Sequence, residues 1–152
     1  MFCFRVQIQE YRFLKAPYES NVHWREDTDC LRCSPHFHGH PRYDFVIVDT
    51  RNHGHIFAQI HTVFTCSING TAHPLALVQP LDAPTGARNR TERDLELLRV
   101  RTKPPAHSEF ISVKSIMRGA VLVQDFDKAG DYFVVDTIDG DIFLRCRALL
   151  PQ

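Results

Sequence analysis

Residues 55–79 contain the feature that most restricts the fold, a long alternating segment that turns back on itself at Asn69-Gly70. The part before the turn, residues 55–68, is rich in β-branched and aromatic residues, and residues 71–79 continue the pattern. Asn-Gly suits a tight hairpin turn because both residues tolerate a positive φ. The two segments are therefore predicted to pair as antiparallel strands, the first of them long enough to bend across a barrel.

Short strands are predicted on both sides of this hairpin, from apolar runs that are bounded by turn residues. Residues 43–49 form an almost continuous apolar run, which is typical of a strand buried on both faces. The other predicted strands are residues 2–8, 95–102, 109–116, 119–124, 131–137 and 141–147, the last of them entered through a hairpin turn at Asp139-Gly140.

Two segments are predicted to be loops. Residues 9–29 contain Pro17 and the only tryptophan, Trp24, and fit neither a helical nor a strand period, although one helical turn near Trp24 is expected. Residues 80–93 are rich in proline and are predicted to lie on the surface. No segment keeps a helical period for three turns, so a parallel α/β fold lacks its crossover helices. The predicted fold class is all-β, a partly open barrel of about eight mostly antiparallel strands with long loops.

The length of 152 residues predicts a single domain, residues 1–152. No apolar run approaches the roughly 20 residues of a membrane span, and the first residues lack the basic leader and cleavage site of a signal peptide. Three of the five cysteines (Cys3, Cys66 and Cys146) stand alone in apolar stretches, which suits reduced thiols better than a disulfide framework. The expected location is intracellular, nuclear or cytoplasmic, without a membrane partner.

A zinc site is the sharpest chemical hypothesis. Cys30 and Cys33 have the spacing of a metal knuckle, and His36 and His38 would complete a tetrahedral set. The spacing after Cys33 is unusual, because structural sites normally separate their two ligand pairs by a dozen or more residues. The alternative is that these residues are buried thiols and surface histidines. Zinc is the only cofactor that the sequence suggests.

The sequence gives less support to catalysis. The Cys30 and Cys33 thiols could form a redox pair, with Arg32 favouring a thiolate, but such pairs open a helix in a βαβ frame that this sequence lacks. The aspartates of residues 125–131 and 136–141 fall at turns, where aspartate is favoured for backbone geometry, and the mixed sheet of two-metal nucleases is absent. The protein is therefore predicted not to be an enzyme.

The charge balance argues against nucleic acid as the main partner. The chain has 18 basic and 18 acidic side chains, whereas a domain that binds phosphates normally carries a basic excess. Residues 88–103 hold a local excess, which is usually a solvated surface. If nucleic acid were bound, the contacts would come from Arg42, Arg88, Arg90, Arg99, Arg101 and Lys103.

Three stretches carry a resemblance to a known group of proteins. They are DCLRCSPHFHGHPRYD (residues 29–44), IFAQIHTVFTC (residues 56–66) and FISVKSIMRGA (residues 110–120). They resemble a β-rich segment of uncharacterised fungal proteins, several of which are transposase-related. The resemblance implies a transposon-derived context and carries no assigned chemistry.

The order of the predicted elements also resembles, more distantly, a bromo-adjacent homology domain. This resemblance implies a β-barrel that binds partner proteins or nucleosomes, in some members through an aromatic cage for methylated lysine. The candidate cage residues would be Trp24, Tyr43, Phe45 and Phe57, since a cation is attracted to several ring faces; otherwise these aromatics belong to the core.

Together these observations predict a non-enzymatic interaction module that binds a protein, a peptide or a chromatin-type partner. The alternative is a zinc-stabilised nucleic-acid-binding domain that uses residues 88–103.

Overall fold

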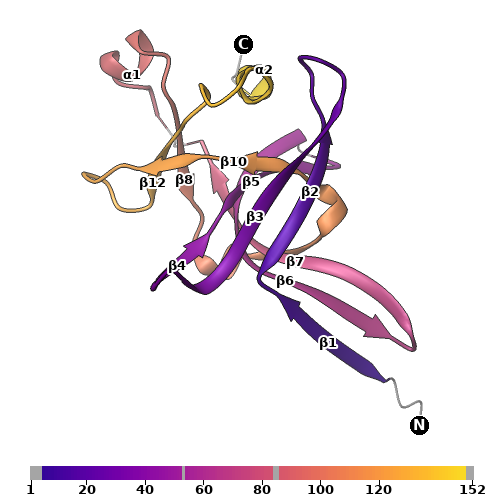
Figure 1. The fold of residues 1–152 in the computed structure, drawn as a ribbon. Helices are drawn as coiled ribbons and strands as arrows, with labels where there is room; N and C mark the ends of the chain where they lie inside the picture. Colours follow the sequence, from indigo (N-terminus) through magenta and orange to yellow (C-terminus); the bar gives the residue numbers. More distant parts are fainter. Residues whose placement is uncertain (1–4, 53, 84–85, 150–152) are drawn as a thin grey trace.

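The computed structural model of the protein describes residues 5–52, 54–83 and 86–149 (Figure 1). Two antiparallel sheets make up most of it. Their strands are β1 (Val6–Tyr11), β2 (Phe13–Glu19), β3 (Glu26–Phe37), β4 (His40–Tyr43), β5 (Phe45–Thr50), β6 (Gly54–Ile68), β7 (Thr71–Asp82), β8 (Leu98–Thr102), β9 (Glu109–Ser112), β10 (Ile116–Ala120), β11 (Leu122–Gln124) and β12 (Asp131–Val134). Two α-helices, α1 (Arg90–Asp94) and α2 (Gly140–Leu149), and two 3-10 turns, η1 (Pro105–His107) and η2 (Val113–Ser115), complete the described part.

The prediction of an all-β fold with antiparallel strands is confirmed. The large sheet has nine strands in the order β10-β5-β6-β7-β8-β12-β11, with β1 beside β6 and β9 beside β7, and the small sheet has the order β2-β3-β4. Within the described residues the end strands β10 and β11 do not pair with each other, so the large sheet stays open. The described residues form twelve strands instead of about eight, in part because residues 13–43 contribute three that the sequence pattern does not reveal.

The hairpin at Asn69-Gly70 forms as predicted. Asn69 has a φ of 50° and Gly70 a φ of 85°, and Ile68 pairs with Thr71 directly beyond them. The long strand β6 serves as the shared strand of the large sheet. Its first half pairs with β5 and its second half with β1, while β7 runs along its other side. A bulge at His61 separates the two halves, because Ile60 pairs with Val78 and Thr62 pairs with the adjacent Leu77.

The core has two layers, one on each face of the large sheet. Strand β5 is buried on both faces, as its apolar run predicts: Val46 and Val48 belong to one cluster and Ile47 to the other. The first cluster lies between the large and small sheets and includes Ala16, Leu31, Cys33, Ala58, Ile60, Val63, Ala76, Val78 and Ile116. The second includes Phe57, Leu81, Val100, Val134, Ile142 and Cys146, and is therefore covered by helix α2.

The predicted closing strand at residues 141–147 is wrong, because this segment is helix α2. Asp139 does not make a hairpin turn. Its backbone oxygen accepts from the Phe143 amide at 3.1 Å and its carboxylate from the Ile142 amide at 2.8 Å, which is the bonding of a helix N-cap. Ile142 and Cys146, four residues apart, are buried on one face of the helix. Aspartate before glycine is compatible with a hairpin turn and with the start of a helix. Packing of Ile142 and Cys146 in the second core cluster selects the helix.

The predicted loop at residues 9–29 is also wrong over most of its length. Strand β2 pairs with β3 from Phe13 to Glu19, and Pro17 is tolerated because β2 is an edge strand. Between these strands residues 21–23 form a turn instead of a regular helix, closed by the Trp24 amide, which donates to the Ser20 carbonyl at 2.9 Å. Strand β1 begins at Val6; residues 2–4 of the predicted first strand lie outside the described residues. Residues 90–93, predicted as part of a loop, belong to the short helix α1.

Among the described residues, no helix is both long and apolar enough to cross a membrane.

The assignment of residues 140–149 as a helix makes a testable distinction. In a strand Ile142 and Leu144 would share a face, whereas in α2 Ile142 is 1% exposed and Leu144 is 47% exposed. We expect Ile142→Ala to lower the free energy of unfolding by about 2–4 kcal/mol, because it leaves a cavity in the second core cluster. Leu144→Ala should change it by less than about 0.5 kcal/mol. Urea denaturation of both variants measures the difference, and similar losses in both would contradict the helix.

Candidate functional site

One pocket of the described structure lies where the small sheet, the edge of the large sheet and α2 meet. We call it the Asp29 pocket; it has a volume of about 200 Å³. Strand β3 contributes Asp29, Cys30 and Leu31, and residues 42–45 form a second side. Strand β10 and the segment from Ile138 to Ile142 complete it. Its lining residues are Asp29, Cys30, Leu31, Arg42, Asp44, Phe45, Arg118, Gly119, Ala120, Val121, Ile138 and Ile142.

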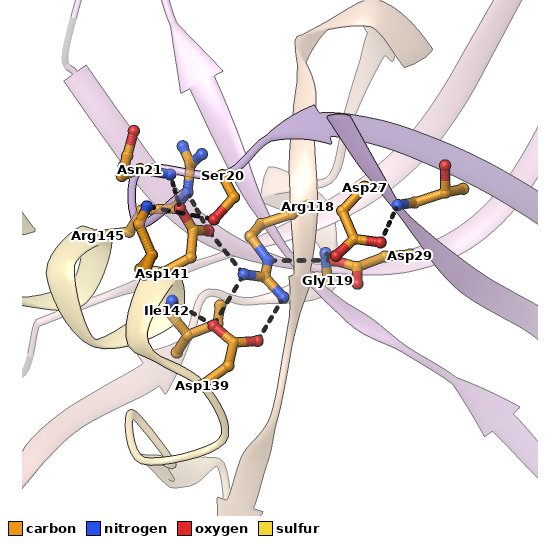
Figure 2. A network of polar contacts seen from close by, with 12 residues as sticks. Ser20, Asn21, Asp27, Asp29, Arg118, Gly119, Asp139, Asp141, Ile142 and Arg145 are labelled. Atoms are coloured by element: carbon orange, nitrogen blue, oxygen red, sulfur yellow. Dashed lines mark hydrogen bonds and ion pairs between the residues drawn. The ribbon is translucent and has the colours of Figure 1, made fainter. Parts of the chain in front are cut away.

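A buried arginine lines the pocket. Figure 2 shows its polar contacts. The side chain of Arg118, on β10, is only 5% exposed. Its guanidinium contacts three carboxylates: Asp141 at 2.7 Å, Asp139 at 3.0 Å and Asp29 at 3.2 Å. The Tyr18 ring packs against it with the guanidinium carbon 4.1 Å from the ring centre. One side chain therefore joins the large sheet, the small sheet and the start of α2.

Asp141 extends this network to the β2–β3 turn. Its carboxylate accepts from the Arg145 guanidinium and from the Asn21 amide, both at 2.7 Å. Arg145 in turn donates to the Glu19 carbonyl at 2.8 Å. Helix α2 is thus fixed to the small sheet by polar contacts as well as to the large sheet by apolar packing.

These contacts shift the pKa values of the groups involved. Burial alone would lower the pKa of Arg118, but its hydrogen bonds to Asp139 and Asp141 outweigh burial and leave the pKa raised. Burial would raise the pKa of Asp139 and Asp141, yet hydrogen bonds from arginines and from the Ile142 and Asn21 amides hold both below their usual range. Arg118, Asp139 and Asp141 are therefore all ionised at neutral pH.

The pocket has two partly exposed carboxylates. Asp29 is 24% exposed and accepts from the Gly119 amide at 2.8 Å in addition to Arg118. Asp44 is 19% exposed and accepts from the Arg32 amide at 2.8 Å and from Arg42 at 2.9 Å. Two carboxylates, Asp29 and Asp44, and two guanidinium groups, Arg42 and Arg118, are the charged side chains that line the pocket, so the lining charges balance.

The rest of the pocket is apolar. Phe45 and Ile142 form its inner part, where the Phe45 ring packs against Tyr132 with 5.0 Å between ring centres. Val121 and Ile138 line it as well and are 48% and 49% exposed. Gly119 allows β3 to approach closely, since a Cβ there would lie 2.9 Å from a Leu31 methyl carbon. The arrangement can hold a side chain with an apolar stem and a positive end.

The structure does not bring the predicted zinc ligands together. Cys30 and Cys33 lie three residues apart in β3, which places them about 10 Å apart along the strand and on opposite faces. Cys30 is exposed and lines the Asp29 pocket, while Cys33 is buried and donates to the Tyr11 carbonyl at 3.4 Å. Burial raises the pKa of the Cys33 thiol. His36 is exposed, and His38 lies in the β3–β4 turn with a φ of 49°.

Among the described residues, no group of three His, Cys, Asp or Glu side chains is placed to hold a metal ion. The zinc hypothesis stays a prediction. The two cysteines do not form a redox pair in this structure either. A disulfide requires Cα atoms less than about 7 Å apart, and their separation along β3 is larger than that.

The four predicted cage aromatics lie in different surroundings. Trp24 is in the β2–β3 turn and 73% exposed, whereas Phe57 is 4% exposed in the second core cluster. Tyr43 packs on the first cluster and contacts His61, and Phe45 contacts Tyr132. Only Phe45 lines the Asp29 pocket.

Most of the predicted nucleic-acid contacts are already paired with carboxylates. Arg99 is 11% exposed and contacts Glu92 and Asp125 at 2.5 Å and Asp131 at 3.0 Å. Asp131, which is fully buried, also pairs with Arg101 at 2.5 Å. Of the others, Arg42 pairs with Asp44, Arg90 with Asp94 and Lys103 with Asp82, while Arg88 lines a separate pocket beside this network. The local basic excess is thus largely neutralised in the folded chain.

The sequence pattern did not indicate the Arg118 network. The pattern places Asp139 and Asp141 at turns and leaves Arg118 between the predicted strands of residues 109–116 and 119–124. The available signal was a charged residue inside the apolar run Ile116-Met117-Arg118-Gly119-Ala120. A charge in such a run is rarely buried unless it is paired.

The site and fold together define an all-β protein with open sheets and a small, partly apolar pocket that two carboxylates and two arginines line. Comparison with protein-family models, with curated proteins and with solved structures finds no match. The two resemblances stated from the sequence therefore stay predictions.

The Arg118 network should be essential for stability. We expect Arg118→Met to lower the free energy of unfolding by about 3–5 kcal/mol, because it leaves buried carboxylates without a cation. Arg90→Met is a matched control, since Arg90 is 88% exposed and pairs with Asp94 at 3.5 Å; it should change stability by less than about 0.5 kcal/mol. Chemical denaturation compares them, and equal effects would argue against the network.

Acid should weaken the fold through the same aspartates. Asp139 and Asp141 have a lower pKa in the folded than in the unfolded chain, so their contribution is complete above the unfolded value of about 3.9 and is lost as pH falls toward the folded pKa. We expect the melting temperature to be steady near neutral pH and to fall steeply below about pH 4. Asp139→Asn should show a smaller fall. A wild-type melting temperature that stays constant down to pH 2 would contradict this assignment.

Proposed function

We propose that the protein is a non-enzymatic interaction module whose Asp29 pocket receives a lysine or arginine side chain from a partner protein. The observation that supports this best is the composition of the pocket, in which two partly exposed carboxylates, Asp29 and Asp44, stand beside an apolar wall. A basic side chain combines an aliphatic stem with a charged end, and it can bury the stem while the end reaches a carboxylate.

The rigidity of the site agrees with this function. Asp29 and Asp44 are held by backbone amides, from Gly119 and Arg32 respectively, and need no rearrangement to accept a ligand. A chromatin-type partner with exposed basic segments would suit such a site.

A titration with single amino-acid amides tests the ligand class. We expect N-acetyl-arginine amide and N-acetyl-lysine amide to shift the backbone NMR signals of Gly119, Ala120 and Val121, while N-acetyl-glutamine amide does not. Asp29→Asn should raise the dissociation constant of the lysine and arginine compounds about tenfold, because a hydrogen bond to a charged group is worth about 1.5–3 kcal/mol.

The matched control is Asp49→Asn, which removes a carboxylate that is 60% exposed and lies outside the pocket lining. It should bind as the wild type does. Equal shifts with the glutamine compound, or shifts that Asp29→Asn leaves unchanged, would refute the proposed ligand.

A further inference from the structure

A second pocket lies between helix α1, strand β8 and the turn that leads into β12. We call it the Lys128 pocket; it has a volume of about 180 Å³ and shares no lining residue with the Asp29 pocket. Strands β8 and β12 lie side by side in the large sheet (Figure 1), and three residues separate α1 from β8. Three parts of the chain, residues 86–92, 99–101 and 128–131, therefore meet at this pocket.

The charged side chains of the Lys128 pocket are mostly basic. Four cations line it against two carboxylates, namely Arg88, Arg99, Arg101 and Lys128 against Glu92 and Asp131. One further carboxylate, that of Asp125, accepts from Arg99 without lining the pocket. The basic groups stay in excess when it is added, and a pocket with such an excess attracts an anion.

One arginine compensates the carboxylates of the pocket. The Arg99 guanidinium is 11% exposed and donates to Glu92 at 2.8 Å and to Asp131 at 3.0 Å. Its guanidinium carbon lies 4.4 Å from the centre of the Phe133 ring. Glu92 and Asp131 are themselves only 9% and 1% exposed. Their charges are thus paired inside the wall of the pocket, and they repel an anion in the pocket only weakly.

The remaining basic groups keep donors for a ligand. Arg101 is 53% exposed, and Asp131 accepts from its Nε and Nη2 atoms, while no partner for Nη1 is found in the part of the chain that the structure describes. Within the described ranges, Arg88 and Lys128 have no ion-pair partner. A guanidinium carries five N–H donors and an ammonium three. These three side chains can therefore surround one ligand with several hydrogen bonds.

A phosphate group matches these donors better than a carboxylate does. A phosphate monoester carries nearly two negative charges at neutral pH and has three terminal oxygens that accept hydrogen bonds. Arginine binds such oxygens through its planar fork, and lysine binds them as a point charge. A carboxylate offers a single charge and two oxygens, which would leave part of the basic cluster unused.

The arrangement of the cations also favours a terminal phosphate over a nucleic-acid backbone. A phosphodiester chain presents its charges in a row, and proteins meet that row with basic side chains spread along a surface. Here the basic side chains come from three segments and line one pocket. We propose that the Lys128 pocket binds a phosphate dianion, carried by a phosphorylated side chain or by a small phosphorylated molecule. This site is independent of the Asp29 pocket and of the function proposed for it.

A titration of the full chain at constant ionic strength tests the site with three probes, which are inorganic phosphate, N-acetyl-phosphoserine amide and N-acetyl-glutamate amide. We expect the two phosphate probes to shift the backbone NMR signals of Arg88, Arg101 and Lys128 and to leave that of Gly119, in the Asp29 pocket, unchanged. The glutamate probe should bind about tenfold more weakly, since it has less charge and fewer acceptors. Tighter binding of the phosphoserine probe than of inorganic phosphate identifies a phosphorylated side chain as the source, and the reverse order identifies a small molecule.

Two variants test the basic side chains that have no ion pair. Arg88→Gln and Lys128→Gln should each raise the dissociation constant of the phosphate probes about tenfold, because each removes a charge-assisted hydrogen bond. Arg93→Gln is the matched control, since Arg93 is exposed on α1 and lies outside the pocket lining. It should bind as the wild type does, and thermal melting confirms that all three variants are folded.

The absence of shifts with both phosphate probes overturns the proposal. Shifts of equal size with the glutamate probe overturn it as well, and so does an affinity that Arg88→Gln and Lys128→Gln both leave unchanged. An oligothymidylate without terminal phosphates is the last probe. If it binds more tightly than the phosphoserine compound, the basic side chains contact a nucleic-acid backbone and the proposal is wrong.

Discussion

The described structure depends on one buried guanidinium. Arg118 brings together carboxylates from three separate parts of the chain, the small sheet at Asp29, the loop before α2 at Asp139, and the first turn of α2 at Asp141. A buried arginine with several carboxylates contributes less to net stability than its short contacts suggest, because all the charges lose their hydration. Its geometric effect is large, since the removal of any one partner leaves the others unbalanced. The network therefore specifies how the helix and the two sheets fit together.

The Asp29 pocket is a consequence of that fit. Its carboxylates come from β3 and from the junction of β4 and β5, and its apolar wall from β5, β10 and the start of α2. These segments are distant in the sequence, so the pocket exists only in the folded chain. The same arginine that joins the layers also lines the pocket, which means that ligand binding and stability share one set of contacts.

The elements predicted correctly are those whose local pattern and tertiary surroundings agree. The Asn69-Gly70 hairpin needs only its own two residues, and the apolar run of β5 has a core cluster on each side. The errors arose where the surroundings decide. Pro17 is compatible with a strand only because β2 lies at an edge, and Asp139-Gly140 begins a helix only because Ile142 and Cys146 pack on the large sheet. The pairing of Arg118 with Asp29, 89 residues away, could not be read from any local spacing.

The bulge at His61 has an effect that reaches to the end of β6. Along a strand, side chains alternate between two faces, and one extra residue exchanges the faces for everything beyond it. Before the bulge, the even-numbered Ala58 and Ile60 face the first core cluster; after it, the odd-numbered Val63 takes that side. Phe64, Cys66 and Ile68 are thereby turned outward. The one extra residue therefore changes which residues of β6 face the first core cluster, and it places Phe64, Cys66 and Ile68 on the other side of the sheet.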